Sequence, residues 1–408
     1  MKRVHGFISI VAGVAVALSS VSAVLGAPTE RVLYSFKAEP DGDQPFSEVI
    51  KDSDGNLYGT TLRGGLYGGC HSVGCGVVYK LSPDGNETLL YTFKGGKDGG
   101  TPRAGLVMDG SGNLYGTTYE GGRRAGEVGC GNYGCGTVFK LSPDGSEVVL
   151  HSFHGRNDGA HPSASLLLDS EGNLFGTTGD GRIPACNDGL GCGTVFKLAP
   201  DGTLTTLHSF TGGADGNTPF GGVIKDREGN LYGTTQHGGD DSCDCGTVFK
   251  IAPDGKKTVL HSFTHSDGGD PLSTLIRDRA GNLYGTTNQG PGFDCSGVGC
   301  GTVFKIAKNN QFTVLHAFLG PENNDGQWPM GNLTLDKAGS LYGTTTEGGT
   351  GICAGGCGTV FKITPDGFES VLYSFQGIDG DRPGGVFEDK KGRLFGTTLT
   401  GGVNGHGV

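Results

Sequence analysis

The heptapeptide Gly55-Asn56-Leu57-Tyr58-Gly59-Thr60-Thr61 decides the fold, because this chain of 408 residues contains it or a near copy seven times. Neighbouring copies start 52 to 60 residues apart. The other six copies begin at Gly112, Gly172, Gly229, Gly281, Gly339 and Gly392. This period is too long for leucine-rich or ankyrin units, and it suits one propeller blade with an extended loop.

Each repeat divides into four runs rich in Val, Ile, Phe, Tyr and Thr, separated by turn residues. In the second repeat we name them strands A to D, and they span Ala104–Met108, Asn113–Tyr119, Gly136–Leu141 and Glu147–Phe153. Such short strands, apolar on both faces, need cover from neighbouring blades. The sequence therefore predicts an all-β, seven-bladed β-propeller of four-stranded antiparallel blades.

The two ends of the repeat region predict how the ring closes. Val32–Phe36 matches strand D, and the seventh repeat supplies only strands A and B. We expect the N-terminal strand to complete the last blade, which removes the exposed sheet edges of an open array. We also expect the native chain to continue beyond Val408, where strand C of the last blade would begin.

Residues 1–27 have the features of a secretory signal peptide: Lys2 and Arg3, an apolar run from Phe7 to Leu18, and small residues up to Ala27. The apolar run is shorter than the ~20 residues of a membrane-spanning helix, although an anchor is the alternative interpretation. Residues 28–408 then form the propeller, and we expect a protein that is secreted, periplasmic or attached to the cell surface.

The composition limits the partners. The chain has 81 glycines, 18% charged residues and a net charge of −11. Because residues 1–27 carry two positive charges and no negative one, the remainder carries about −13. An acidic chain without a basic cluster argues against nucleic acid and against an anionic membrane surface as partners. We expect an extracellular ligand, either a polysaccharide or a protein.

The units Asn-Leu-Tyr-Gly-Thr-Thr, Cys-Gly-Thr-Val-Phe-Lys and Ser-Pro-Asp-Gly resemble the GloVer tandem repeat of bacterial exported proteins, whose members end in differing surface-anchoring signals. The resemblance spans residues 31–408. It implies a secreted or surface-attached repeat protein and brings no established activity or catalytic residues. No anchoring signal follows the repeats here, which leaves the mode of attachment open.

Twelve cysteines form six local pairs, each in the loop between strands B and C. An even number in an exported chain predicts disulfides, with metal binding as the alternative. Because pairs on separate blades lie far apart, we expect six disulfides and no metal site. The fourth pair, Cys243 with Cys245, is doubtful because a Cys-x-Cys bridge is strained. The pairs are Cys70 with Cys75, Cys130 with Cys135, Cys186 with Cys192, Cys243 with Cys245, Cys295 with Cys300, and Cys353 with Cys357.

Every connection from strand D to the next strand A contains Asp-Gly-x-x-Pro, and we call it the crossover. Long, variable connections predict that this face, with the B–C loops, binds the ligand. The seven aspartates would ring the channel mouth and suit a cation such as calcium or a polyhydroxyl ligand. Alternatively, each forms hydrogen bonds within its own turn. They are Asp41, Asp98, Asp158, Asp215, Asp267, Asp325 and Asp379.

Two further residue types are candidates with a structural alternative. Trp328, the only tryptophan, lies in a crossover and would either stack on a sugar or anchor the loop. Four histidines occupy the strand D position at which Tyr34, Tyr91 and Tyr373 stand in other repeats, so we interpret them as packing residues on separate strands. These are His151, His208, His261 and His316.

No catalytic motif or cofactor motif is evident, and no repeat combines a base, a nucleophile and an orienting group. The leading hypothesis is a non-catalytic exported propeller that binds a ligand or builds surface structure. The alternative is a propeller enzyme, a lyase or glycan hydrolase, acting at the channel mouth with a bound divalent cation. A purely structural array is a third possibility.

Overall fold

The computed structural model describes residues 29–65, 70, 73–122, 130, 133–155, 158–181, 186, 189–240, 242–291 and 294–408. Arg31–Val408 forms one compact unit, separate from Met1–Glu30. The predicted signal peptide, residues 1–27, lies outside the described residues. Within the described part of the chain, no helix has the length and apolar character needed to cross a membrane.

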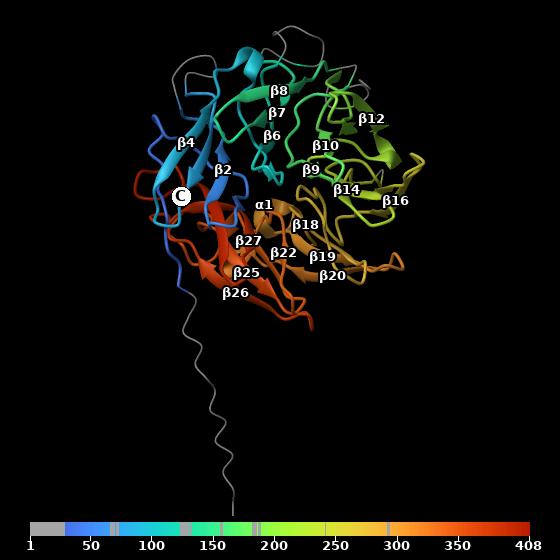
Figure 1. Ribbon diagram of the computed structural model, residues 1–408. Helices are drawn as coiled ribbons and strands as arrows, with labels where there is room; N and C mark the ends of the chain where they lie inside the picture. The colour runs from blue at the N-terminus through green and yellow to red at the C-terminus, as the bar shows by residue number, and fades with distance from the viewer. Residues whose placement is uncertain are drawn as a thin grey trace, which may run out of the picture. The chain divides into compact units, whose positions relative to one another are not determined.

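The repeats form antiparallel four-stranded sheets in which strands pair in chain order. The first three sheets contain β1 (Ile50–Lys51), β2 (Leu57–Thr61), β3 (Val77–Leu81) and β4 (Glu87–Thr92); β5 (Val107–Met108), β6 (Leu114–Thr118), β7 (Thr137–Leu141) and β8 (Glu147–Ser152); β9 (Leu167–Leu168), β10 (Leu174–Thr178), β11 (Thr194–Leu198) and β12 (Leu204–Ser209). Figure 1 shows the sheets following one another around a common centre, coloured from blue to red along the chain.

Three more four-stranded sheets follow. They contain β13 (Ile224–Lys225), β14 (Leu231–Thr235), β15 (Thr247–Ile251) and β16 (Lys257–Ser262); β17 (Ile276–Arg277), β18 (Leu283–Thr287), β19 (Thr302–Ile306) and β20 (Phe312–Ala317); β22 (Thr334–Leu335), β23 (Leu341–Thr345), β25 (Thr359–Ile363) and β26 (Glu369–Ser374). A short pair, β21 (Gly326–Gln327) and β24 (Glu347–Gly348), joins a crossover to a loop, and a helical segment, α1 (Asp294–Gly297), lies between β18 and β19.

The described residues contain six four-stranded blades, so the prediction of seven is wrong. The seventh repeat forms only the two-stranded sheet of β27 (Asp381–Glu388) and β28 (Leu394–Thr400). Val32–Phe36, expected to complete this blade, is not a strand. The reason is that Gly401–Val408, which follows β28, forms turns and single bridges, so no third strand is present for it to pair with.

The ends of the compact unit nevertheless meet. The backbone N–H of Phe36 donates to the carbonyl of Gly407 at 3.1 Å, and that of Gln44 donates to the carbonyl of His406 at 3.1 Å. Lys51 in β1 forms an ion pair with Asp389 of the seventh repeat at 3.0 Å. Repeats 1 and 7 are therefore neighbours in the ring.

The heptapeptide has a packing role that explains its central glycine. In the fourth blade, Gly233 in β14 pairs with Phe249 in β15, and a Cβ on Gly233 would lie 2.6 Å from the Phe249 ring. The aromatic ring thus covers the glycine, and the same pairing of glycine with an aromatic residue recurs in the five other blades. These rings lie in apolar clusters between adjacent blades, where the core of the protein is found.

The first threonine of the heptapeptide links adjacent repeats. Thr60 donates to the carbonyl of Ala104 in the next repeat at 3.0 Å, and Thr177 donates to that of Gly221 at 3.1 Å. Thr397 of the seventh repeat donates to the carbonyl of Ser47 in the first at 2.9 Å. Buried polar groups need such partners. These bonds align the innermost strands around the central axis.

Candidate functional site

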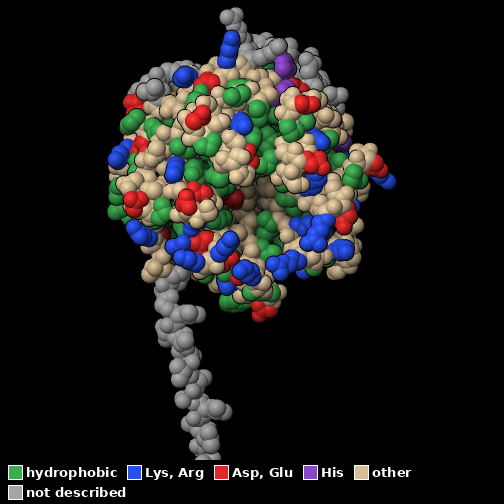
Figure 2. All heavy atoms as spheres, in the orientation of Figure 1, with side chains coloured by type: hydrophobic (Ala, Val, Ile, Leu, Met, Phe, Trp, Pro, Cys, Tyr) green, Lys and Arg blue, Asp and Glu red, His purple; other side chains and the backbone are tan. Residues whose placement is uncertain are grey.

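The ring encloses a central cavity of about 410 Å³, lined by residues from all seven repeats. Figure 2 shows the hollow near the middle of the face in view. Most of the lining comes from the crossovers and the residues just after their prolines, so the cavity lies at the face that the sequence marks as variable. A concave site of this volume accommodates a small organic molecule.

The residue type at the third position after each crossover proline varies between the repeats. In the first six repeats this position holds one acidic side chain, Glu48, and a small or polar residue elsewhere. The N–H of Gly222 donates to Thr274 Oγ1 at 2.9 Å, and the N–H of Thr274 donates to Asn332 Oδ1 at 2.7 Å. Two hydrogen bonds thus link the fourth, fifth and sixth repeats beside the cavity. The residues that accompany Glu48 are Gly105, Ser165, Gly222, Thr274 and Asn332.

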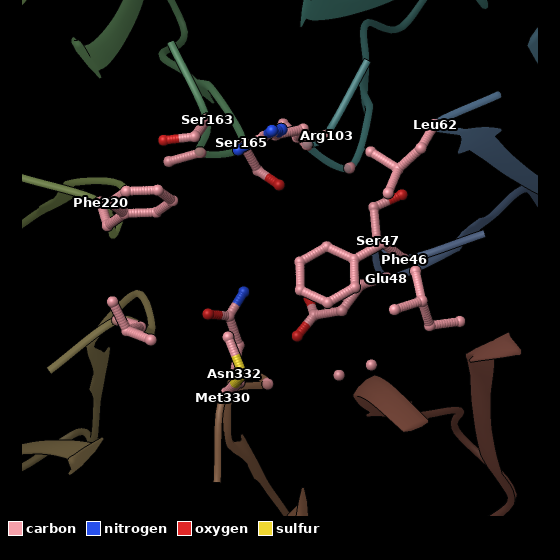
Figure 3. A pocket seen from close by; sticks show the side chains of 18 of the residues that line it. Phe46, Ser47, Glu48, Leu62, Arg103, Ser163, Ser165, Phe220, Met330 and Asn332 are labelled. Atoms are coloured by element: carbon pink, nitrogen blue, oxygen red, sulfur yellow. The ribbon is translucent and has the colours of Figure 1, made fainter. Parts of the chain in front are cut away.

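Glu48 is the acidic residue of the cavity lining. It accepts hydrogen bonds from the side chain and the backbone of Asn332, and Figure 3 shows the two side chains turned toward one another. Its Oε1 atom is buried and has no hydrogen-bond partner among the described residues. Burial raises the pKa of Glu48 to about 7, although the bonds from Asn332 act in the opposite direction.

The seventh repeat makes room for this carboxyl group. A Cβ added to Gly385 would lie 2.1 Å from Glu48 Oε1, so a side chain there would force the Glu48 carboxyl group to move. Apolar side chains surround the pair, and Phe46, Phe220 and Met330 line the same cavity. The cavity lining therefore combines one acid, the amides of Gln44 and Asn332, the guanidinium groups of Arg63 and Arg103, and aromatic surface.

The crossover aspartates lie elsewhere: none of the seven is among the residues that line this cavity. Each instead accepts a hydrogen bond from the strand D tyrosine or histidine, at 2.5 to 3.3 Å, and from a backbone N–H, at 2.7 to 3.1 Å. We call this pair of residues the latch. The four histidines interpreted as packing residues are the latch histidines.

Three latches have a glutamate from the neighbouring blade beside them. Glu87, Glu147 and Glu369 each begin a strand D and have a buried Oε1 without a hydrogen-bond partner. Burial, and next the charge of Asp41 or Asp98, raises the pKa of Glu87 and of Glu147 to about 7. In the fourth blade a lysine takes this place, and Lys257 binds Asp215 at 2.7 Å.

Substituting Asp98 by alanine tests the latch. The variant loses the bonds from the Tyr91 hydroxyl at 2.9 Å and from the Lys94 N–H at 3.0 Å. We expect the free energy of unfolding to fall by about 1–2 kcal/mol, with or without calcium, in a urea titration. Asp54→Asn, at an exposed turn, is the control and should change it little. A loss of stability that appears only when calcium is present would instead identify Asp98 as a calcium ligand.

The crossover residue before each proline has a left-handed backbone, with φ between 52° and 62°. Such a conformation is uncommon for residues other than glycine and needs support from its surroundings. These residues are Gln44, Thr101, His161, Thr218, Asp270, Trp328 and Arg382.

The preceding B–C loop supplies this support through the second cysteine of its pair. Thr101 donates its N–H to the carbonyl of Cys75 at 2.8 Å. The equivalent residue of each of the five later crossovers donates to the second cysteine of the B–C loop before it, at 2.8 to 3.1 Å. Each disulfide loop is therefore tied to the crossover that follows it. The acceptors in these later repeats are the carbonyls of Cys135, Cys192, Cys245, Cys300 and Cys357.

The six predicted disulfides are confirmed, including the doubtful Cys-x-Cys bridge. None of the twelve cysteines is among the residues that line the cavity, so the disulfides support the site from outside and do not face a ligand in it. Their role is to brace the segments that lead into the cavity. The bonds join Cys70 to Cys75, Cys130 to Cys135, Cys186 to Cys192, Cys243 to Cys245, Cys295 to Cys300, and Cys353 to Cys357.

Trp328, the candidate for stacking on a sugar, lies in a crossover and is partly buried. It is not among the cavity residues. Its indole Nε1 is buried without a hydrogen-bond partner. The structure therefore separates this side chain from the central cavity.

Sequence reasoning missed Glu48 and Asn332. An alignment of the seven repeats on their crossover prolines would have marked this position as variable, with a single acid. It would not have shown that a glycine in the seventh repeat lets the side chains of repeats 1 and 6 meet, since that contact depends on ring closure.

Three comparisons place the chain among known proteins. The model of the Gloeobacter/Verrucomicrobia repeat matches residues 18–189 and 185–408. No curated protein matches significantly. Among solved structures, the extracellular domain of a one-component system from B. thetaiotaomicron superposes with a TM-score of 0.54 at 13% identity, covering 88% of this chain and 38% of that one.

Two enzymes are similar more distantly. A gluconolactonase from Xanthomonas campestris is 16% identical, with 74% of this chain and 84% of that one covered and a TM-score of 0.42. A luciferin-regenerating enzyme is 14% identical, with 76% and 85% covered and a TM-score of 0.42. The likeness to the one-component system domain shows a shared fold.

Proposed function

This chain belongs to the Gloeobacter/Verrucomicrobia repeat family, and we propose that it is an exported binding protein that holds a small, uncharged, hydroxyl-rich ligand such as a sugar in its central cavity. The observation that carries the proposal is Glu48, whose Oε1 is buried without a protein partner at the cavity wall. A buried polar atom without a partner costs free energy, which a ligand hydroxyl would recover once a rotation of the carboxyl group turns Oε1 toward the cavity.

The rest of the lining suits such a ligand. Phe46 and Phe220 offer aromatic surface for the apolar face of a sugar ring, while Asn332 and Ser165 offer hydrogen bonds to hydroxyl groups. Small-molecule sites commonly combine a mainly apolar wall with a few placed polar groups. Because Glu48 has a pKa of about 7, it carries a proton over much of the range below neutrality and then attracts cations less than a free carboxylate does.

Export is supported by the cysteines. Six disulfides persist in an oxidising compartment and are rare in the cytosol. The secretory features of residues 1–27 agree with this compartment.

The binding test is calorimetric titration of the mature protein with a panel of monosaccharides and disaccharides. We expect at least one to bind, and Glu48→Ala to lower its affinity about tenfold or more, because a buried ligand hydroxyl left without its partner costs about 1–3 kcal/mol. Asp54→Asn is the control and should bind normally. Sugar binding unaffected by Glu48→Ala, or no binding across the panel, would contradict the proposal.

The pH dependence of the affinity separates ligand classes. A neutral ligand that accepts a hydrogen bond from protonated Glu48 favours the protonated form, so its affinity falls as the pH rises through about 7. A cationic ligand favours the carboxylate, so its affinity rises over the same interval. Glu48→Gln should remove either dependence. The first pattern supports the proposed uncharged ligand, and the second would replace it with a cation.

An enzyme is the second candidate, and the same residue favours it. A carboxyl group with a pKa of about 7 is suited to general acid and base catalysis near neutrality. Binding remains the preferred function because the described lining of the cavity holds one acid, whereas glycan hydrolysis generally uses two. Turnover of a bound sugar, abolished in Glu48→Gln, would establish the enzyme.

A further inference from the structure

The latch of the second blade contains an additional histidine. His151 at the end of β8 and His154 three residues later both contact Asp158 of the crossover. His151 Nε2 lies 2.7 Å from Asp158 Oδ2, and His154 Nδ1 lies 3.1 Å from the same oxygen. The three side chains each offer a ligand atom, and these atoms all lie within 4.8 Å of one another.

The latch does not require His154. In every repeat the backbone N–H at this position binds the crossover aspartate, whatever the side chain. His154 thus adds a second nitrogen ligand where the repeat pattern asks for none. The side chains at the equivalent positions have no imidazole and are Lys37, Lys94, Thr211, Thr264, Leu319 and Gln376.

The described part of the neighbouring blade places no lysine beside this group. Leu204, the first residue of β12, occupies the register position that Lys257 holds one blade later. Lys257 forms an ion pair with Asp215 at 2.7 Å, which neutralises that carboxylate. Among the described residues, Asp158 has no such lysine, and both imidazoles lie within hydrogen-bond distance of its Oδ2 atom.

We propose that His151, His154 and Asp158 bind a divalent transition-metal ion, with zinc as the reference ion. Two imidazoles and one carboxylate form a donor set that zinc, nickel and cobalt accept, and the remaining coordination positions would hold water or a ligand from solution. The side chains are 13 to 28% exposed, so an ion reaches them from solvent.

Other groupings in the described residues are weaker. Two of them use Cys243 with Cys245, or Cys353 with Cys357, and these sulfurs are joined in disulfides. The remaining grouping contains one imidazole and follows the latch and glutamate arrangement of the other blades. Its members are His316, Asp325 and Glu369.

The test is calorimetric titration of the untagged, chelator-treated protein with Zn²⁺. We expect one ion per chain, and loss of that binding in His154→Thr, which copies Thr211 of the next repeat. His151→Tyr, which copies Tyr91 and keeps a latch, should lose it as well. His208→Tyr alters the matching latch of the third blade and should bind one ion like the parent. Each variant's circular dichroism spectrum and melting temperature without metal confirm its folding.

A gain of binding provides the second arm. Thr211→His combined with Lys257→Leu copies His154 and Leu204 beside His208 and Asp215, and we expect this variant to bind two ions per chain. The proposal is overturned if the parent protein binds no zinc at a free concentration of about 10 µM, a weak affinity for a three-ligand site. It is equally overturned if His154→Thr, correctly folded, binds zinc as the parent does.

Discussion

Gly246→Ala will destabilise the protein by about 4 kcal/mol or more, whereas Gly255→Ala in the same blade will cost about 1 kcal/mol. Both glycines have positive φ angles, of 93° and 85°. An added Cβ on Gly246 would lie 2.3 Å from the carbonyl oxygen of Thr235 and 2.7 Å from Pro271 Cδ. At Gly255 it would meet nothing within 4 Å.

Comparing Gly246→Ala with Gly255→Ala separates two contributions to the loss of stability. Gly255→Ala measures the backbone penalty of a left-handed residue, and Gly246→Ala adds steric overlap with a backbone atom that cannot move alone. Guanidinium titration followed by tryptophan fluorescence and by circular dichroism gives both values. Equal costs for the two substitutions would show that the contact between strand C and the next crossover is looser than described.

The second large effect concerns the aromatic core. Phe249→Ala should lower the free energy of unfolding by about 3–5 kcal/mol, the usual cost of removing a buried phenylalanine ring. Phe249 is fully buried, covers Gly233, and packs edge-to-face on Phe210 of the preceding blade at 5.3 Å. Because Gly233 has no side chain, nothing on that strand refills the space.

Phe368→Ala is the control for this substitution, because that ring is 69% exposed. We expect it to change stability by no more than about 0.5 kcal/mol. The difference between the two variants, measured by denaturant titration under one set of conditions, reports the packing between blades. A cost below about 1 kcal/mol for Phe249→Ala would contradict the account in which blade contacts form the core.

Much of this architecture follows from repetition in the sequence. The heptapeptide predicts the blades because its residues have roles that recur from blade to blade: Gly233 receives Phe249, Tyr232 binds the turn residue Asp226, and Thr234 binds the next repeat. The cysteine pairs were equally predictable, since each lies within one loop. Local features that recur along the chain leave a clear pattern.

The seventh repeat shows where the repeat pattern gives a wrong prediction of structure. Val32–Phe36 has the sequence of strand D, and Phe36 is buried like its counterparts, yet the segment forms no strand. A strand requires a partner edge, and the short glycine-rich stretch after β28 provides hydrogen bonds at single residues only. The sequence pattern reports the propensity of the segment and not the presence of its partner.

The candidate site was harder to predict because it depends on departures from the pattern. The crossover aspartates attracted attention through sevenfold repetition, but their bonds to the latch residues explain that repetition structurally. Glu48 and His154 are each unique at their repeat position, and their contacts cross repeats or turns that only the fold brings together. In this ring, both candidate sites lie at positions where one repeat differs from the others.

The most direct test of the central claim is a crystal structure of the mature protein soaked with the sugar that binds most tightly. We expect ligand density in the central cavity, with a hydroxyl group within hydrogen-bond distance of Glu48 and a ring face against Phe46 or Phe220. Density for the sugar on the disulfide loops or the outer strands, with the central cavity holding only solvent, would contradict it.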